Sequence, residues 1–515
     1  MFSNVLGSIN KVQGDRISFY LDKGSTVFFG QMVRINSGER SFYARVVNAQ
    51  SSSTLNTGEQ LREAQGKEAF GPYSSYKNIE AILFLEKCEG RIRSPTFNPN
   101  YMDKVIAANA EDCGTLKLEG ELEVGRLRSG EEVIGNVGVN VDSIPYMMGM
   151  FGMIGSGKTN CELVLNAQLV DHSPKTVGVI FDFAGQLLEG KGIKPQKGLR
   201  DHPLFHTKIS YYSTKDGRMK IGLHALSPNK LQTLFSDITP PQGKIAWGLY
   251  KLFGASWIEQ ARALFAEGGY RELYKKLSYG KKETIEALMM KLSALPLELY
   301  PPTDYNFVDS VIENISRGIT CLVDISGLTA EEQHRITTLT ASNAAYYYKQ
   351  AWESNHEVWQ KLPTLLITLE EAHEFLDPAQ PRTIFSDIAL TYRKYRVGLN
   401  AVTPRPSKIN LDVFAELWTK VIMKTELSQD RRYLTENTPY LEYSDTEIKM
   451  LDIGEALLIS EPKIRFAVPV NATHYPEYLD RAVPVDYNLP PSAPLSDMDE
   501  RLKQLRKNSG SIAKH

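Results

Sequence analysis

The segment Gly152–Thr159 constrains this chain more than any other stretch of its sequence. It reads GMIGSGKT and satisfies the pattern G-x-x-x-x-G-K-[ST] of a phosphate-binding loop. An apolar strand is predicted before it and a helix after it, with Leu163, Ala167 and Val170 on one face of that helix. Glycines allow successive backbone N–H groups to surround a phosphate, and the start of the helix adds partial positive charge. The order of strand, glycine loop and helix predicts a nucleotide-binding α/β fold.

Each residue type in this loop predicts a different contact with the nucleotide. Lys158 is expected to bridge the β- and γ-phosphates, and the hydroxyl of Thr159 is expected to bind Mg²⁺. ATP and Mg²⁺ are therefore the expected cofactors. The residues expected to bind the nucleotide are Gly152, Gly155, Ser156, Gly157, Lys158 and Thr159.

A second functional element is predicted at 363–371, which reads PTLLITLEE, on a strand that neighbours the strand of the phosphate-binding loop. A carboxylate at the end of a strand can hold the magnesium shell, and the next one can orient and polarise the attacking water. We assign Glu370 to the metal shell and Glu371 to the water. Away from a phosphate-binding loop, paired glutamates after a strand are more often the solvated start of a helix.

Arginines form a third cluster, in the segment YRKYRVGLNAVTPRP at 392–406. An arginine just before a core strand could lie at a subunit edge and reach the γ-phosphate of a neighbouring subunit, where its charge would stabilise the transition state. Arg393 is our candidate for this arginine finger, with Arg396 and Arg405 as alternatives. A basic surface patch without a catalytic role is the competing interpretation.

Composition excludes several classes of protein. The chain has 515 residues, 42% of them hydrophobic, which fits two to four domains with buried cores and excludes a disordered or coiled-coil protein. No apolar run approaches the roughly 18 residues that span a bilayer, and the first residues do not resemble a secretion signal. The four cysteines are far apart and form no CxxC pair, which fits a reducing cytosol. We expect a cytoplasmic protein without a membrane segment.

The pattern of apolar residues divides the chain into five segments. We predict a small β-barrel at 1–115, the first part of an α/β core at 116–224 and a helical insertion at 225–315. The second part of the core follows at 316–470, with an extended arm and tail at 471–515. Strands that alternate with longer helices predict a parallel sheet with helices on both faces.

Short apolar runs locate the elements within these segments. The predicted barrel strands are 17–21, 32–35, 42–47 and 79–85, with a loop at 51–76. The predicted core strands are 146–151, 177–181, 319–324, 365–369 and 398–402, with a hairpin at 456–470. The predicted helices of the insertion are 231–235, 247–253, 257–265 and 285–295. An extended arm is expected at 484–494 and a basic, solvated tail at 501–515.

Taken together, the motifs resemble those of the HerA family of hexameric DNA translocases and helicases, within the group that includes the FtsK pumps. The stretches that carry this resemblance, beside the phosphate-binding loop, are IFD at 180–182, VDISGL at 323–328, EEAH at 370–373, RKY at 393–395 and TPRP at 403–406. The resemblance implies an α/β fold with a RecA-like P-loop core, an N-terminal β-barrel of the kind shared with ATP synthases and a helical insertion.

The resemblance also implies a function. Members of this family are ATP-hydrolysing motors that form rings, commonly hexamers, around double-stranded DNA and work with a partner effector. A NurA-type or other nuclease, or in antiviral defence systems a sirtuin-like NAD-degrading protein, would be such a partner. We expect this chain to be the motor subunit.

Two departures from the family pattern affect these expectations. Pro404 occupies the position where relatives often carry a glutamine that could sense the γ-phosphate, which puts the rate of hydrolysis in question. Phe183–Gln186 replaces the His-Gly-Glu that often follows the second core strand. An ATP-dependent assembly scaffold with weak hydrolysis is therefore a competing function. A rotary-type ATPase subunit fits the EEAH and RKY motifs poorly, and a GTPase lacks its Asn-Lys-x-Asp motif.

Contact with DNA would have to come from a local basic surface, because the net charge of the whole chain is −2. The loop 191–200 carries Lys191, Lys194, Lys197 and Arg200 and no acidic residue. Such a loop would follow phosphates without reading bases. A solvated basic loop is an equally good interpretation of this segment.

Overall fold

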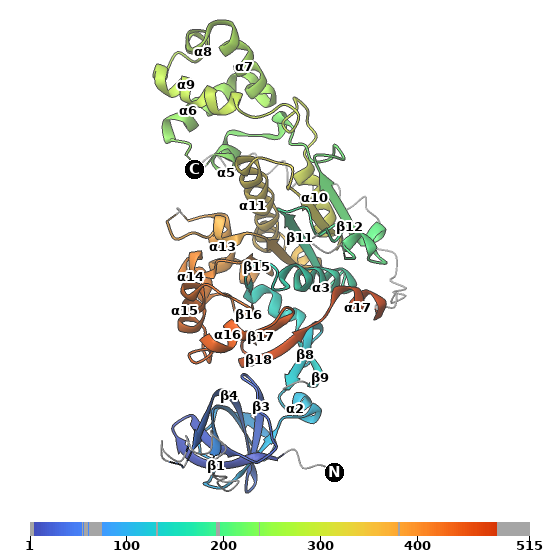
Figure 1. Ribbon diagram of the computed structural model, residues 1–515. Coiled ribbons are helices and arrows are strands. Elements are labelled where there is room, and N and C mark those ends of the chain that lie inside the picture. Colours follow the sequence, from blue (N-terminus) through green and yellow to red (C-terminus); the bar gives the residue numbers. More distant parts are fainter. Residues whose placement is uncertain are drawn as a thin grey trace. The chain divides into compact units, whose positions relative to one another are not determined.

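The computed structural model describes residues 5–53, 55, 60, 75–129, 132–191, 196–235, 237–379 and 382–481 (Figure 1). The described residues up to Asp480 belong to one compact unit. The extended arm expected at 484–494 and the tail at 501–515 lie outside the described residues, as does most of the loop expected at 51–76. The two ends of that expected loop are strand, because β4 continues to Ser53 and β5 begins at Ser75.

The N-terminal strands close into a barrel, as the sequence predicts. The order is β2-β1-β7-β3-β4-β5, and β5 pairs with β2 to complete the closed sheet. Inward-facing residues such as Ile9, Phe19 and Phe42 form its core. Strands β1, β6 and β7 were not predicted, because polar residues interrupt the alternation of β1 and because β6 and β7 have only three and four residues. The strands are β1 Val5–Gln13, β2 Arg16–Leu21, β3 Met32–Ser37, β4 Arg40–Ser53, β5 Ser75–Cys88, β6 Arg91–Arg93 and β7 Lys104–Ala107.

The second sheet has the order β12-β13-β11-β14-β15-β10-β16-β17-β18-β8-β9. Strands β12 to β16 in this order are parallel, and the remaining pairings are antiparallel. The strands are β8 Leu122–Ser129, β9 Glu132–Val139, β10 Met148–Phe151, β11 Thr176–Asp182, β12 Ile209–Ser213, β13 Thr320–Asp324, β14 Thr364–Leu369, β15 Val397–Thr403, β16 Thr419–Met423, β17 Glu455–Ser460 and β18 Ile464–Ala472.

The structure confirms the five predicted core strands and the hairpin, with two corrections. The first core strand begins at Met148, because Val141–Tyr146 forms a 3-10 helix that contains Pro145. The strand with the paired glutamates, β14, does not neighbour β10, because β15 lies between them and pairs with both. Strand order depends on contacts between distant segments, so the local sequence does not reveal it.

Helices cover both faces of the parallel sheet, as predicted (Figure 1). On one face, α3 (Lys158–Asp171) places Cys161, Leu165 and Leu169 against residues of β10 and β14. On the other face, α11 (Ala330–Ser354) and α13 (Ile384–Thr391) pack in a larger cluster with residues of β11, β14 and β15. Among the described residues, no helix is long and apolar enough to cross a membrane.

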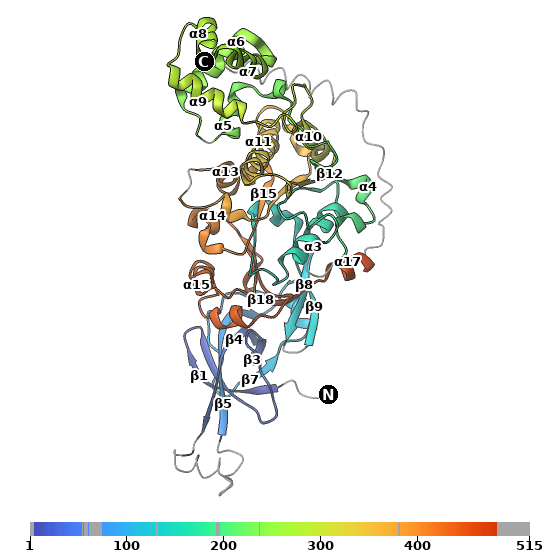
Figure 2. The ribbon, with the colours of Figure 1, turned by 45° about the horizontal axis from the view of Figure 1, so that its top comes forward.

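The segment between β12 and β13 is helical. Figure 2 shows α6 to α9 grouped together near α5. Trp257 is fully buried in this group and its indole Nε1 donates to the Leu226 carbonyl at 2.7 Å. The predicted helices are present, whereas α8 and α10 were not predicted. The helices are α5 Leu231–Leu234, α6 Pro240–Phe253, α7 Trp257–Gly268, α8 Tyr270–Leu277, α9 Lys282–Ser293 and α10 Phe307–Ser316.

Candidate nucleotide site

The phosphate-binding loop lies between the end of β10 at Phe151 and the start of α3 at Lys158. Gly155 and Gly157 have φ angles of +82° and +112°, which side chains rarely adopt. At Gly152, an added Cβ would come within 2.7 Å of the Ser156 Oγ atom. Three of the predicted nucleotide ligands are therefore glycines for reasons of backbone geometry.

The Lys158 side chain folds back over the loop. Its ammonium group donates to the carbonyls of Gly152 at 2.6 Å and Met153 at 3.0 Å. Burial lowers the pKa of Lys158, although the charges of Glu371, Glu162 and Glu370 oppose this effect. The ammonium group thus lies among acidic side chains, where phosphate oxygens can replace the two carbonyls as acceptors. Thr159 lies beside it in the first turn of α3.

Two further segments form backbone hydrogen bonds with the phosphate-binding loop. The Met153 N–H donates to the Lys424 carbonyl at 2.8 Å, and the Gly454 N–H donates to the Ser156 carbonyl at 3.0 Å. Lys424 follows β16, and Gly454 precedes β17. These contacts were missed in the sequence analysis, because no motif marks either position.

Acidic residues end three neighbouring strands at the sheet edge that carries the phosphate-binding loop. Asp182 and Asp324 are paired in register at the ends of β11 and β13, and Glu370 follows β14. Asp182 accepts from three backbone N–H groups, of Gly185, Gln186 and Leu187, at 2.6 to 3.1 Å. Burial nevertheless raises the pKa of Asp182. The sequence analysis assigned no role to these two aspartates.

Glu370, the expected magnesium ligand, directly follows β14 and is partly buried. Its Oε2 atom accepts from the Phe183 N–H at 2.8 Å, and burial together with the charge of Asp182 raises its pKa to about 8. A divalent cation would offset the repulsion between such carboxylates. Hydroxyl and carboxylate oxygens are also the ligands that Mg²⁺ prefers. The residues therefore fit a magnesium ion held by Thr159 and Glu370.

Glu371 occupies a strained backbone position. Its φ is +48°, in the left-handed region, and its side chain is half exposed. The carboxylate lies 3.4 Å from His373 Nδ1, and the same nitrogen lies 3.0 Å from Thr403 Oγ1. Glu371 is thereby connected through His373 to the end of β15, directly before Pro404. Strain of this kind is frequent at functional sites.

Arg393 lies at the opposite edge of the sheet. It belongs to the 3-10 helix Tyr392–Tyr395 that precedes β15, and its guanidinium group lies 5.0 Å from the Tyr146 ring and 5.6 Å from the Trp418 ring. These residues line a cavity of about 350 Å³. Arg393 therefore does not join the phosphate-binding loop of its own chain.

The two alternative arginines have different surroundings. Arg396 stacks on the Trp359 ring at 4.1 Å and donates to the Trp359 carbonyl. Arg405 follows β15 at the same sheet edge as the phosphate-binding loop and is exposed. Arg396 is therefore committed to local packing, whereas Arg393 and Arg405 remain available to other chains.

The basic loop predicted to contact DNA is partly neutralised. Lys197 forms an ion pair with Asp480 at 2.8 Å, and Arg200 forms one with Glu189 at 2.5 Å. Lys191 is exposed, and Lys194 lies outside the described residues. The sequence analysis counted acids only within 191–200 and so missed both partners.

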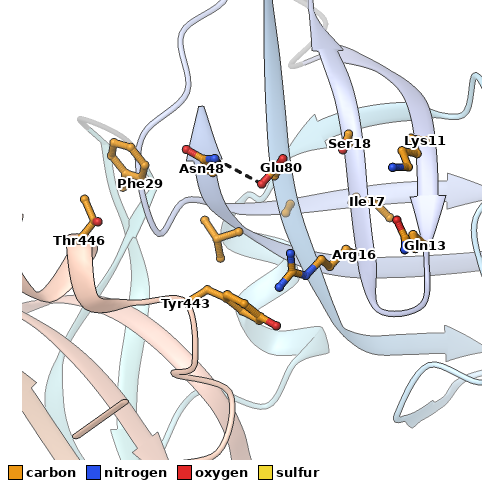
Figure 3. Close-up of a pocket in the computed structure, with 12 residues that line it drawn as sticks. Lys11, Gln13, Arg16, Ile17, Ser18, Phe29, Asn48, Glu80, Tyr443 and Thr446 are labelled. Carbon is orange, nitrogen blue, oxygen red and sulfur yellow. Dashed lines mark hydrogen bonds between the residues drawn. The ribbon is translucent and has the colours of Figure 1, made fainter. Parts of the chain in front are cut away.

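A separate pocket of about 450 Å³ lies where the barrel meets the segment around α16 (Asp445–Met450). Figure 3 shows Arg16 of β2 directed at Tyr443, and the guanidinium group lies 4.1 Å from the ring. Asn48 donates to Glu80 at 3.3 Å on the barrel side. The pocket shares no residue with the phosphate-binding loop or its carboxylates.

The fold and the site together define a P-loop ATPase in which one strand, β15, separates the P-loop strand β10 from β14, the strand that precedes the paired glutamates. A family model described as "Helicase HerA, central domain" matches residues 122–344. The chain is 23% identical over 404 residues to the DNA double-strand break repair helicase HerA of Sulfurisphaera tokodaii, covering 73% of this chain and 74% of that protein. The HerA of Pyrococcus furiosus is 22% identical over 514 residues, covering 84% and 90%. Residues 122–344 thus match the central domain of the HerA helicases, and similarity to HerA proteins extends over most of the chain.

The chain is also similar to solved structures of two other proteins. The plasmid coupling protein TrwB in complex with a non-hydrolysable ATP analogue has a TM-score of 0.45 and 13% identity, covering 71% of this chain and 93% of that one. VirB4 of Thermoanaerobacter pseudethanolicus has a TM-score of 0.44 and 15% identity, covering 70% and 98%.

Proposed function

We propose that this protein is the motor subunit of an ATP-driven, ring-forming DNA translocase. The observation that carries the proposal is the gathering of Lys158, Thr159, Glu370 and Glu371 at one sheet edge. This edge provides a cation for the phosphates, oxygens for a metal and a carboxylate for water. The similarity to HerA helicases supports the same function.

In the proposed reaction, the glycine loop binds the phosphates through its N–H groups, and Lys158 exchanges its two carbonyl acceptors for β- and γ-phosphate oxygens. Thr159 and Glu370 would hold Mg²⁺, which neutralises charge on the phosphates when bound. Glu371 orients the attacking water, and its contact with His373 fixes the carboxylate. The His373–Thr403 hydrogen bond links this step to β15, where the family's glutamine is replaced by Pro404.

The position of Arg393 supports action between subunits. Because it lies at the sheet edge opposite its own phosphate-binding loop, it can serve only a site on another copy of the chain. We propose a homo-oligomeric ring, with six subunits as in the family, that encloses double-stranded DNA. We further propose that the ring acts with a partner effector, such as a nuclease or a sirtuin-like protein. The helices at 225–315 are proposed to be an insertion into the core.

An ATP-dependent scaffold is the second candidate function, and Pro404 favours it. ATP hydrolysis with and without duplex DNA distinguishes the two. The motor predicts hydrolysis that rises several-fold with duplex DNA, and the scaffold predicts slow hydrolysis that DNA does not change. Lys158→Ala is the control, because loss of the ammonium group should remove ATP binding and reduce turnover below a tenth of normal. A Lys158→Ala variant that keeps more turnover would contradict the site.

A further inference from the structure

The side of the phosphate-binding loop that faces away from Glu370 and Glu371 has no role in the proposed reaction. In the sheet, β15 and β14 lie on one side of β10, and β16 and β17 lie on the other. Hydrolysis requires the γ-phosphate to face the two glutamates, so the ribose and base of a bound nucleotide extend away from them. Groups that bind the base are therefore expected among the segments next to β16 and β17.

Two chain segments meet on this side of the loop. The turn before β17 contacts the loop directly, since the Gly454 N–H donates to the Ser156 carbonyl at 3.0 Å. A Cβ added at Gly157 would lie only 3.4 Å from the Gly454 nitrogen. The end of β18 lies beside the same turn, because the Ala472 N–H donates to the Gly454 carbonyl at 2.8 Å. The turn and the end of β18 are thus joined to each other and to the phosphate-binding loop.

Asn160 fixes the chain that follows β18. It comes directly after Thr159 in the first turn of α3. Its Nδ2 atom donates to the Thr473 carbonyl at 2.7 Å, and its Oδ1 atom accepts from the Tyr475 N–H at 2.8 Å. One amide group therefore holds the backbone on both sides of His474. Thr473 and Tyr475 are buried, whereas His474 is exposed beside the start of α3.

The two segments present one aliphatic and one aromatic side chain to solvent. Ile453, at the tip of the turn before β17, is 73% exposed. The His474 ring forms no hydrogen bond, ion pair or ring contact within the part of the chain that the structure describes. Single exposed apolar residues are ordinary on a protein surface. This pair differs, because hydrogen bonds connect the backbone at both positions to the phosphate-binding loop or to the first turn of α3.

We propose that Ile453 and His474 bind the purine base of the nucleotide, by apolar contact and by ring stacking. Bases stack on aromatic side chains, and ligand sites are lined mainly by apolar and aromatic groups. The inference rests on the proposed function of the site, because it assigns residues to the base of the same nucleotide. It also gives a reason for Asn160, whose amide group fixes the position of His474.

The test measures the equilibrium binding of two ligands to the full chain in the presence of Mg²⁺: ATP and inorganic tripolyphosphate, which has no base. His474→Ala removes the ring, His474→Phe keeps an aromatic ring, and Ile453→Ser removes the apolar side chain. Two exposed positions give matched controls. His206→Ala lies on α4 (Phe205–Lys208), which precedes the edge strand β12, and Met290→Ser lies on α9, where the residue is 72% exposed.

His474→Ala and Ile453→Ser should each weaken ATP binding by about tenfold and leave tripolyphosphate binding within about twofold of wild type. His474→Phe and both controls should bind ATP within about threefold of wild type. The preference for ATP over CTP should fall in His474→Ala, because the smaller pyrimidine gains less from stacking. Should His474→Ala not fold, His474→Ser takes its place.

Three results would overturn the proposal. They are unchanged ATP binding in His474→Ala, an equal loss of ATP and tripolyphosphate binding in that variant, and an undiminished preference for ATP over CTP. Failure of the proposed function looks different, because a wild-type protein without a working phosphate-binding loop would bind neither ATP nor tripolyphosphate.

Discussion

At the scale of single residues, the site depends on how each acid is fixed. Asp182 is held by three backbone N–H groups and Glu370 by one, whereas the Glu371 carboxylate lies beside the His373 side chain. The firmly held acids suit a structural or metal-binding role. Glu371, which is half exposed, is the one placed to reach a water molecule.

Glu371→Gln should therefore separate binding from hydrolysis. The amide cannot polarise water, so turnover should fall by at least a hundredfold while ATP affinity stays within about threefold. Single-turnover hydrolysis and equilibrium binding of ATP measure the two effects. Glu357→Gln, an exposed acid on α12 (His356–Lys361), is the matched control and should hydrolyse ATP normally. Full activity of Glu371→Gln would assign the water to another residue.

At the scale of elements, the barrel contains a buried acid that has both charged and hydrogen-bonding partners. Glu86 on β5 is inaccessible to solvent and pairs with Arg40 at 2.5 Å and Arg93 at 2.9 Å. Burial alone would raise the pKa of Glu86, but hydrogen bonds from the Thr96 N–H and from Arg93 lower it to about 2. The folded-state pKa thus lies below that of the unfolded chain.

This shift predicts how barrel stability depends on pH. The ionised Glu86 stabilises the fold when the pH is above the unfolded-state pKa of about 4.5. This contribution to the free energy of unfolding is lost as the pH falls toward about 2. Glu86→Gln should therefore lower the thermal midpoint at about pH 7, and its difference from wild type should shrink by about pH 3. Glu89→Gln, an exposed neighbour, should match wild type at both values. A constant difference across this range would contradict the pKa shift.

The 3-10 helix before β15 makes a prediction about assembly. Arg393→Ala should leave ATP binding by the single chain unchanged and reduce turnover by at least tenfold in the ring, because the arginine serves a neighbouring site. Mixing Arg393→Ala with Lys158→Ala should restore part of the activity, since some interfaces then combine an intact loop with an intact arginine. No recovery at any ratio, with mixed rings confirmed by native mass spectrometry, would exclude action between subunits and favour Arg405.

The elements also show what the sequence could predict. The phosphate-binding loop, β14 with its glutamates and the four barrel strands β2 to β5 follow from local patterns, because each depends on neighbouring residues. The place of β15 between β10 and β14 depends on pairing between segments more than two hundred residues apart, which no local pattern encodes. Glu162, whose charge acts on Lys158, left a weak signal: Glu162 and Asn166, one turn apart, are polar residues within the stretch 161–170 of α3, which is buried throughout.

At the scale of the whole molecule, contact with DNA must come from a local surface, because the net charge is only −2. The loop 191–200 remains our candidate, although Lys197 and Arg200 have acidic partners. An ion-paired group must lose its partner before it binds a phosphate. We therefore expect Lys191, which is exposed and forms no ion pair among the described residues, to contribute more to DNA binding than Lys197 or Arg200.

Salt dependence of duplex binding tests this expectation. Each lost phosphate contact should reduce the slope of log affinity against log salt by about 0.9, so replacing Lys191 and Lys194 by alanine should remove up to about 1.8. Replacing all four basic residues should remove at most about 3.6. The loss should be equal on two duplexes of unrelated sequence, because phosphates carry no base information.

The matched control removes four lysines from the α8–α9 region. Two of these lysines, Lys275 and Lys282, already pair with Glu272 and Glu286. Replacing all four lysines by alanine should therefore leave the salt slope unchanged. The four are Lys275, Lys276, Lys281 and Lys282. An unchanged slope in the loop variants with a reduced slope in this control would move the DNA path to the helices between β12 and β13. Both slopes come from measurements of DNA binding alone. They therefore locate the DNA contacts independently of any effect on ATP hydrolysis.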